Sequence, residues 1–257
     1  MLTRLLKNFS AERTAPEPPP PQVPKGVRVY AIGDIHGRAD LLHRLLSLIE
    51  EDARGARKAE TVLVYLGDYI DRGPDSREVV DRVMAPHAMA DRVVRLRGNH
   101  EEAMLTFIED VERGRGWLDY GGIATLHSYG VRLPPGLLPQ ERFAAMAEQL
   151  AQALPPDHLA FYQRLALSET IGDYFFVHAG INPHLPLADQ DAFDLTTIRS
   201  PFLEWGRRME KVVVHGHSIT PEPQLLPWRI GIDTGAFATG HLTALVLEGG
   251  SQRVLAT

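Results

Sequence analysis

Three stretches of the sequence decide the fold: Gly33-Asp34-Ile35-His36-Gly37, Gly67-Asp68-Tyr69-Ile70-Asp71-Arg72-Gly73 and Arg97-Gly98-Asn99-His100-Glu101. Each follows a run of apolar residues and places acidic, amide or imidazole side chains beside glycines. They recur about one strand–helix–strand unit apart. This rhythm indicates neighbouring strands of one sheet whose C-terminal loops meet at a single point.

The segments around these stretches alternate between strand and helix patterns. Residues 40–49 have the apolar spacing of a helix face. Asp75 and Glu78 resemble a capping box, which predicts a second helix there, and a third is expected from Glu101. Buried strands are predicted at residues 27–32, 61–66 and 92–96.

The pattern changes between about residues 113 and 168. Residues 117–122 have the composition of a loop, whereas residues 141–154 and 157–165 have helical spacing. We therefore expect a helical insert over the site. Short strands should follow and form a second, partly antiparallel sheet, at residues 174–177, 211–215, 229–232 and 242–247.

Composition narrows the classes of function. The chain has 257 residues, a net charge of -6 and no cysteine, which excludes thiolate chemistry and disfavours broad nucleic-acid binding. No apolar run is long enough to cross a membrane, so we expect a cytoplasmic protein. Residues 1–25, with prolines throughout 16–24, are predicted to be a flexible tail capable of weak docking, followed by one domain over residues 26–257.

The polar residues at the predicted strand ends are typical metal ligands. Asp34 and His36 flank one residue, so in an extended segment their side chains point the same way. The carboxylate of Asp68 could bridge two cations. Together with an amide and later histidines, this set would hold two divalent metals about 3.5–4 Å apart. The further candidates are Asn99, His178 and the pair His215 and His217.

These motifs resemble those of the phosphoprotein phosphatase family of binuclear metallophosphoesterases over roughly residues 27–247. The later stretches His178-Ala179-Gly180 and Gly216-His217-Ser218 fit the same family. The segment with Trp117, Gly121-Gly122 and Ser128-Tyr129-Gly130 resembles its bacterial branch. The resemblance implies an α/β four-layer sandwich of two packed mixed β-sheets flanked by helices, with a helical insert near the active site.

The resemblance also assigns the metal ligands. Asp34, His36 and Asp68 match the ligands of one metal, and the second metal takes Asp68 with Asn99, His178 and His217. His217 rather than His215 matches the family's ligand, and His215 could support that ligand without binding the metal itself. We expect two divalent ions, with manganese favoured and iron or zinc also compatible.

The catalytic roles follow from the same motifs. His100 matches the family's general acid, and Asp71 the carboxylate that orients it. Three arginines match the phosphate clamp: Arg72, Arg97 and Arg199. The implied activity is that of a protein serine/threonine phosphatase, in which a metal-bridging hydroxide attacks a phosphorylated protein or a small phosphoester.

Two other functions are compatible with parts of the sequence. The first is a bis(5'-nucleosyl)-tetraphosphatase or related nucleoside-polyphosphate hydrolase. His36 and Asp71 favour the phosphatase, since these positions commonly differ in the dinucleotide hydrolases. The second is an inactive scaffold, which the complete ligand set disfavours.

Overall fold

The computed structural model describes residues 19–257 apart from 56–58 and 134–135. Most of the tail predicted at residues 1–25 lies outside the described residues, and its docking role stays a prediction. Val23 is 3% exposed, and its N–H donates to the carbonyl of Gly249 at 3.0 Å. The packed chain therefore begins before residue 26.

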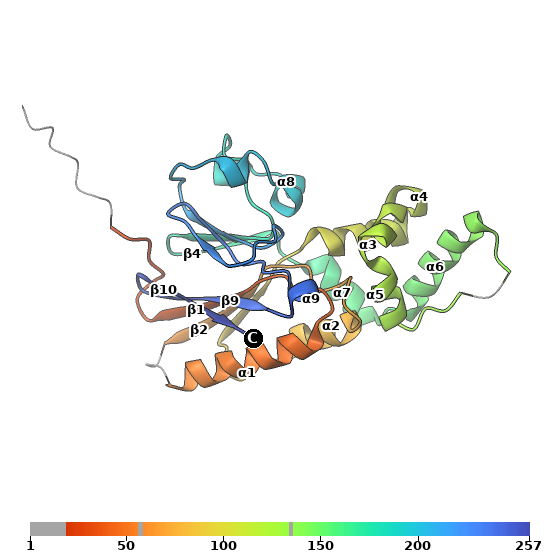
Figure 1. Ribbon diagram of the computed structural model, residues 1–257, viewed down its shortest axis with the longest axis horizontal. Coiled ribbons are helices and arrows are strands. Elements are labelled where there is room, and N and C mark those ends of the chain that lie inside the picture. The colour runs from red at the N-terminus through yellow and green to blue at the C-terminus, as the bar shows by residue number, and fades with distance from the viewer. Residues whose placement is uncertain (1–18, 56–58, 134–135) are drawn as a thin grey trace, which may run out of the picture.

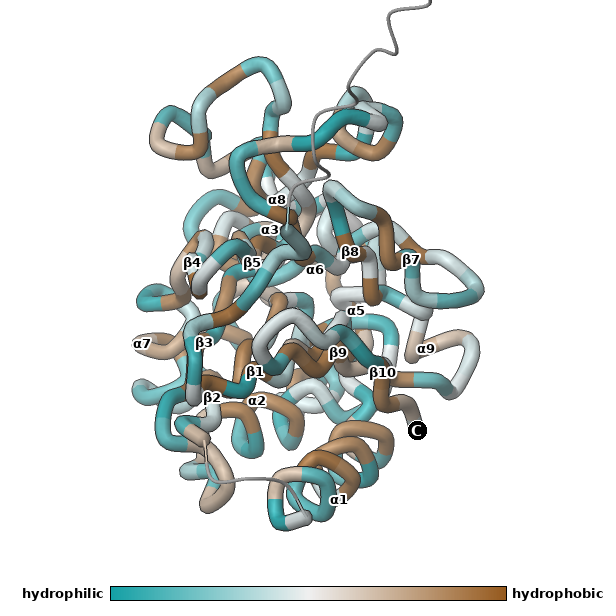
Figure 2. The backbone as a smooth tube through the Cα atoms, turned by 90° about the vertical axis from the view of Figure 1, so that its left-hand side faces the viewer, coloured by the Kyte–Doolittle hydropathy of each residue, from teal (hydrophilic) through white to brown (hydrophobic). Residues whose placement is uncertain are grey.

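The first sheet has the strand order β10-β9-β1-β2-β3. The three predicted strands β1, β2 and β3 pair in parallel, while β9 and β10 pair antiparallel beside β1. The bounds are β1 (Val27–Ile32), β2 (Glu60–Tyr65), β3 (Arg92–Arg95), β9 (Thr243–Glu248) and β10 (Ser251–Ala256). Figure 2 shows hydrophobic segments at β1 and β9, as expected of strands inside the protein.

The second sheet has the order β4-β5-β6-β8-β7, with β5, β6 and β8 parallel and both edges antiparallel. The prediction that residues 242–247 belong here is wrong, because β9 completes the first sheet. A continuous apolar run fits either sheet, so its pattern does not specify its partner. The bounds are β4 (Ser168–Ile171), β5 (Tyr174–Val177), β6 (Val212–His215), β7 (Gln224–Leu225) and β8 (Arg229–Gly231).

Three apolar layers hold the sheets and helices together. Between the sheets, residues such as Val29 and Val64 pack against Phe176 and Ile230. Helices α1 (Ala39–Gly55) and α2 (Ser76–Met84) cover the outer face of the first sheet. Helix α8 (Ala192–Thr197) covers the second sheet, as Figure 1 shows. The predicted fold of two mixed sheets flanked by helices is confirmed.

A run of helices occupies the predicted insert. Residues 117–122, expected to be a loop, instead span the end of 3-10 helix η1 (Arg115–Tyr120) and the start of α5 (Gly122–Ser128). Gly121, in a left-handed conformation, separates these two short helices. The pair Gly121-Gly122 is typical of a loop, which is why the sequence predicted one here. The neighbouring helices are α3 (Asn99–Glu109), α4 (Val111–Gly114), α6 (Pro139–Ala153) and α7 (Pro156–Arg164).

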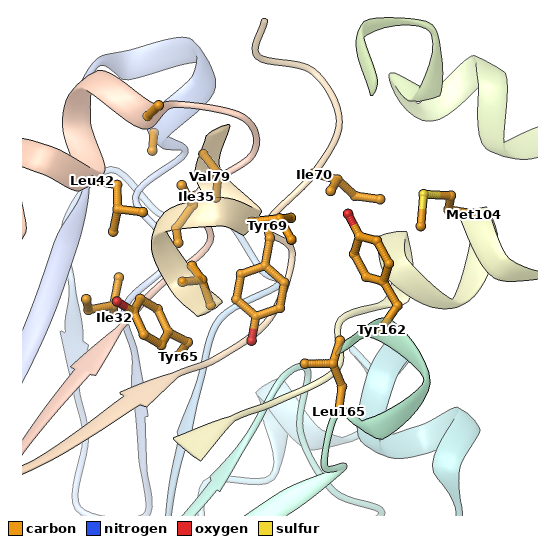
Figure 3. Packing of buried hydrophobic residues seen from close by; sticks show 14 of the residues in the cluster. Ile32, Ile35, Leu42, Tyr65, Tyr69, Ile70, Val79, Met104, Tyr162 and Leu165 are labelled. Carbon is orange, nitrogen blue, oxygen red and sulfur yellow. The ribbon is translucent and has the colours of Figure 1, made fainter. Parts of the chain in front are cut away.

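The insert joins the core of the first sheet. Figure 3 shows Tyr162 of α7 close to Ile70, Met104 and Leu165. The remaining short helices are η2 (Leu187–Asp189), η3 (Phe202–Glu204) and α9 (Ala236–Thr239). None of the helices that the structure describes combines the length and the hydropathy needed to cross a bilayer.

The predicted capping box at the start of α2 is wrong. Asp75 is the N-cap residue, but its side chain makes no cap hydrogen bond. Its backbone has φ -113° and ψ 35°, away from the extended conformation that usually lets a cap side chain reach the first turn. A pattern of four residues does not determine that geometry.

Candidate active site

Left-handed backbone conformations mark the site. Among the described residues, positive φ angles outside glycine occur at His36, Asp68, Asp71, Arg72 and His217. All belong to the sequence-predicted set. Such conformations cost on the order of 1–3 kcal/mol each and persist where the surrounding structure holds them. They turn the chain sharply after the strands, so that side chains from separate loops can face one another.

Backbone hydrogen bonds join the first two loops. The N–H groups of Ile35 and His36 both donate to the carbonyl of Asp68, at 3.1 and 2.9 Å. The third loop approaches so closely that a Cβ atom on Gly98 would collide with the Asp68 carboxylate. Glycine is therefore required there for packing.

Glu101 braces the loops, a role that the sequence did not assign. Its carboxylate accepts N–H bonds from Asp68 at 3.0 Å, Tyr69 at 2.8 Å and Gly98 at 2.9 Å. Burial, reinforced by the charge of Asp68, raises the pKa of Glu101 to about 8. The position of Glu101 three residues after Gly98 is the spacing of a capping box, which is the signal that could have identified it.

Two groups of possible metal ligands meet at Asp68. One comprises His36, Asp68 and His100, and the other Asp68, His178 and His217. Within each group the candidate ligand atoms lie within 4.8 Å of one another. Oδ2 of Asp68 is 3.5 Å from Nε2 of His36, and Oδ1 of Asp68 is 3.4 Å from Nε2 of His178. A carboxylate between two clusters suits a bridging ligand.

The imidazoles are oriented for metal binding. Nδ1 of His36 donates to the carbonyl of Ile70 at 2.8 Å, and Nδ1 of His178 to that of Leu66 at 2.9 Å, which leaves each Nε2 lone pair toward the cluster. Burial lowers the pKa of His36 and of His217 to about 3, so both rings are neutral. Neutral imidazole is the form that binds metals.

The remaining predicted ligands lie beside these groups. Oδ1 of Asn99 is 3.0 Å from Nε2 of His178. Both oxygens of Asp34 accept from the N–H of His217, at 3.1 and 3.0 Å. Burial, together with the charges of Asp233 and Asp68, raises the pKa of Asp34 well above its usual range. Such crowded buried carboxylates favour bound cations, so this donor set fits a pair of divalent ions.

Both ring nitrogens of His215 have partners outside the candidate ligand set. Its Nε2 accepts from Arg229 at 3.3 Å, and its Nδ1 donates to the carbonyl of Gly216 at 2.9 Å. His217, and not His215, joins the candidate metal groups. Asp233 was not among the predicted site residues. It follows β8, so its position as an acidic residue just after a strand could have identified it.

His100 and Asp71 form a braced acid–base pair. Nδ1 of His100 donates to Oδ2 of Asp71 at 2.5 Å. Trp117 Nε1 donates to the same oxygen at 2.7 Å, and Thr125 Oγ1 to Oδ1 at 2.6 Å. Burial alone would lower the pKa of His100, but the carboxylates of Asp68 and Asp71 raise it above its ordinary value. The insert thus fixes the carboxylate that orients this histidine.

Two of the three predicted arginines lie at the cluster. Nη2 of Arg72 is 3.3 Å from Nε2 of His100. Nη1 of Arg199 is 3.0 Å from Nε2 of His217.

Arg97 has partners outside the candidate ligand set, and its predicted role as a phosphate ligand stays a prediction. Its guanidinium donates to Glu102 at 3.0 Å and to the carbonyl of Gln163 at 3.1 Å. Carbonyls near a helix C-terminus attract cations, and those near the end of α7 hold this side chain.

Comparison with known proteins decides the family. The model of the calcineurin-like phosphoesterases matches residues 27–241. The chain belongs to this family. The symmetrical bis(5'-nucleosyl)-tetraphosphatase of Janthinobacterium sp. (strain Marseille) is 26% identical over 85% of this phosphoesterase and 92% of its own length.

Two further comparisons point in different directions. The serine/threonine-protein phosphatase 4 catalytic subunit of Candida glabrata is 40% identical, over 34% of this phosphoesterase and 28% of its own chain. The crystal structure of a candidate diadenosine tetraphosphatase aligns with a TM-score of 0.63 at 22% identity, covering 92% of this chain and 98% of its own. The latter supports the fold alone.

The geometry divides the chemistry of this phosphoesterase among its residues. When bound, two divalent ions supply a water of lowered pKa and neutralise phosphoryl charge. Asp34, His36, Asp68, Asn99, His178 and His217 would hold them. Nε2 of His100 can then give a proton to a leaving oxygen, while Asp71 stabilises the imidazolium. Arg72 and Arg199 can bind non-bridging phosphoryl oxygens.

Proposed function

We propose that this calcineurin-like phosphoesterase hydrolyses phosphoserine and phosphothreonine esters in proteins with two divalent ions, preferably manganese. The observation that carries the proposal is the His100–Asp71 pair braced by Trp117 and Thr125. Asp71 is fully buried and accepts three side-chain hydrogen bonds, so it holds His100 firmly in one orientation.

A braced general acid matters most when the leaving group is a strong base. Cleavage of a serine or threonine phosphate expels an alkoxide, which must be protonated as it leaves. Cleavage of a nucleoside polyphosphate expels a phosphate, whose pKa is about 6 and which departs as a stable anion. The hydrogen bond to the Asp71 carboxylate favours the protonated form of His100, which is the form that gives a proton to the leaving oxygen. That arrangement supports an alkyl ester as the substrate.

A second candidate is hydrolysis of dinucleoside tetraphosphates. It is favoured by the Janthinobacterium relative, which matches this chain over most of both lengths. A cavity of about 500 Å³ beside Asn99, lined in part by Tyr120 and Phe193, could receive a nucleobase or a peptide side chain. Cavity shape therefore does not separate the two substrates.

A parallel assay tests the proposal. The purified protein, reconstituted in turn with manganese, iron and zinc, is assayed with a phosphoserine peptide, an aryl phosphate and a dinucleoside tetraphosphate. The proposal expects the highest kcat/KM for the phosphopeptide and the largest activity with manganese. A dinucleoside tetraphosphate cleaved at least tenfold more efficiently than the peptide would establish the second candidate instead.

A further inference from the structure

Phe237 contacts the site from a part of the chain that no motif covers. It lies on α9, which follows β8. Its ring centre is 4.5 Å from the guanidinium carbon of Arg72. The ring of His36 meets the same side chain edge to face, with 5.4 Å between ring centres and an interplanar angle of 86°. One half-buried ring therefore touches a candidate phosphate ligand and a candidate metal ligand.

Arg72 has few other restraints on its side chain. Its backbone is left-handed, with φ 69°, and its N–H donates to the carbonyl of Gly121 at 3.2 Å. Within the described part of the chain, no carboxylate forms an ion pair with Arg72. Among the described residues, its guanidinium makes one hydrogen-bond contact, the 3.3 Å approach of Nη2 to Nε2 of His100. The ring face of Phe237 and the contact with His100 hold the guanidinium, while its charge also lowers the pKa of Asp34 and of Asp233 without a direct ion pair.

We propose that Phe237 is a positioning residue that holds the guanidinium of Arg72 in place to receive a phosphoryl group. The negative face of an aromatic ring attracts a cation, and a planar guanidinium stacked on it keeps its in-plane N–H donors free. A carboxylate partner would occupy those donors and repel phosphate. The inference rests on the phosphoester hydrolysis proposed above and adds a residue to its phosphate site.

Binding of inorganic phosphate measures this role directly. Phe237→Leu removes the ring face and retains an apolar side chain. In the metal-loaded protein, calorimetry should show a three- to tenfold rise in the Kd for phosphate, with unchanged metal content. Phe237→Tyr should restore binding to within about twofold. Phe143→Leu, on α6, is the matched control and should leave the phosphate Kd unchanged.

A double-mutant cycle tests whether Phe237 acts through Arg72. In the Arg72→Ala background, Phe237→Leu should change neither the phosphate Kd nor kcat/KM for an aryl phosphate. Full effects of both substitutions in the double variant would overturn the proposal, as would equal losses in the Leu and Tyr variants. Because these measurements use phosphate and an aryl ester, failure of the protein-phosphatase assignment would appear separately, in the phosphopeptide assay.

Discussion

Replacing Asp71 by asparagine isolates the charge that supports His100. The new amide can turn its oxygen toward His100 and Trp117, preserving both bonds to that oxygen. Its NH₂ group then faces Thr125, whose hydroxyl can accept instead of donate because Ser76 lies 3.0 Å away as an alternative acceptor. Asp71→Asn should therefore fold normally and keep the histidine in place while removing the negative charge.

The expected loss follows from the strength of that interaction. A hydrogen bond to a charged group contributes about 1.5–3 kcal/mol, and about 1.36 kcal/mol corresponds to tenfold in rate. The kcat for a phosphoserine peptide should fall about 10- to 100-fold. Asp71 helps to raise the pKa of His100, so that pKa should be lower in the variant. His100 then loses its proton at a lower pH than in the wild type. The alkaline limb of the kcat profile should therefore move toward lower pH.

The assay compares leaving groups. Steady-state kcat is measured from pH 5 to 10 for the phosphopeptide and for a nitrophenyl phosphate, whose leaving group needs little protonation. The loss should be at least fivefold larger for the peptide. Asp81→Asn is the control, because Asp81 accepts from His158 at 2.9 Å outside the site. Equal losses on both esters, or an unmoved alkaline limb, would refute the assignment of His100 as the acid.

Four other substitutions probe the site. Asp68→Asn should leave the circular dichroism spectrum unchanged, lower the amount of bound metal measured by mass spectrometry, and reduce kcat by several orders of magnitude. His100→Asn should retain the bound metal and reduce kcat by about 10²–10⁴-fold. Gly216→Ala should weaken metal binding, because its Cβ would collide with the carboxylate of Asp34, whereas Gly55→Ala has open space and should not. Glu101→Gln should lower the free energy of unfolding in urea by about 1–3 kcal/mol at pH 9, where the carboxyl is ionised, since its amide cannot accept every loop N–H. An unchanged midpoint at that pH would contradict the role of Glu101 in holding the loops.

The sequence predicted the parts of the site that lie in contiguous motifs. Asp34, His36, Asp68 and Asn99 each follow a strand that pairs in parallel in the first sheet, so strand order alone brings them together. The parallel sheet and the helices between its strands follow from local apolar periodicity. These features need no knowledge of which distant segments touch.

The features that the sequence did not predict depend on distant packing. The apolar pattern of β9 does not distinguish between the two sheets, and its place beside β1 is decided by pairing across more than 200 residues. Arg97 lies in the expected motif, yet Glu102 and the end of α7 hold its guanidinium. Phe237 lies in no recognised motif, and its proposed role follows from the contacts of its ring with Arg72 and His36.

The backbone of the site explains why motif and scaffold must act together. The motif residues His36, Asp68 and Asp71 adopt left-handed conformations that ordinary side chains disfavour. The local sequence therefore disfavours these backbone conformations, and contacts with other parts of the protein must supply the free energy that stabilises them. Glu101 supplies part of it by binding loop N–H groups, and Thr125 of the insert supplies more by bonding both the backbone and the carboxylate of Asp71. The insert thus helps to hold the candidate catalytic pair, and changes at Trp117 or Thr125 should lower kcat.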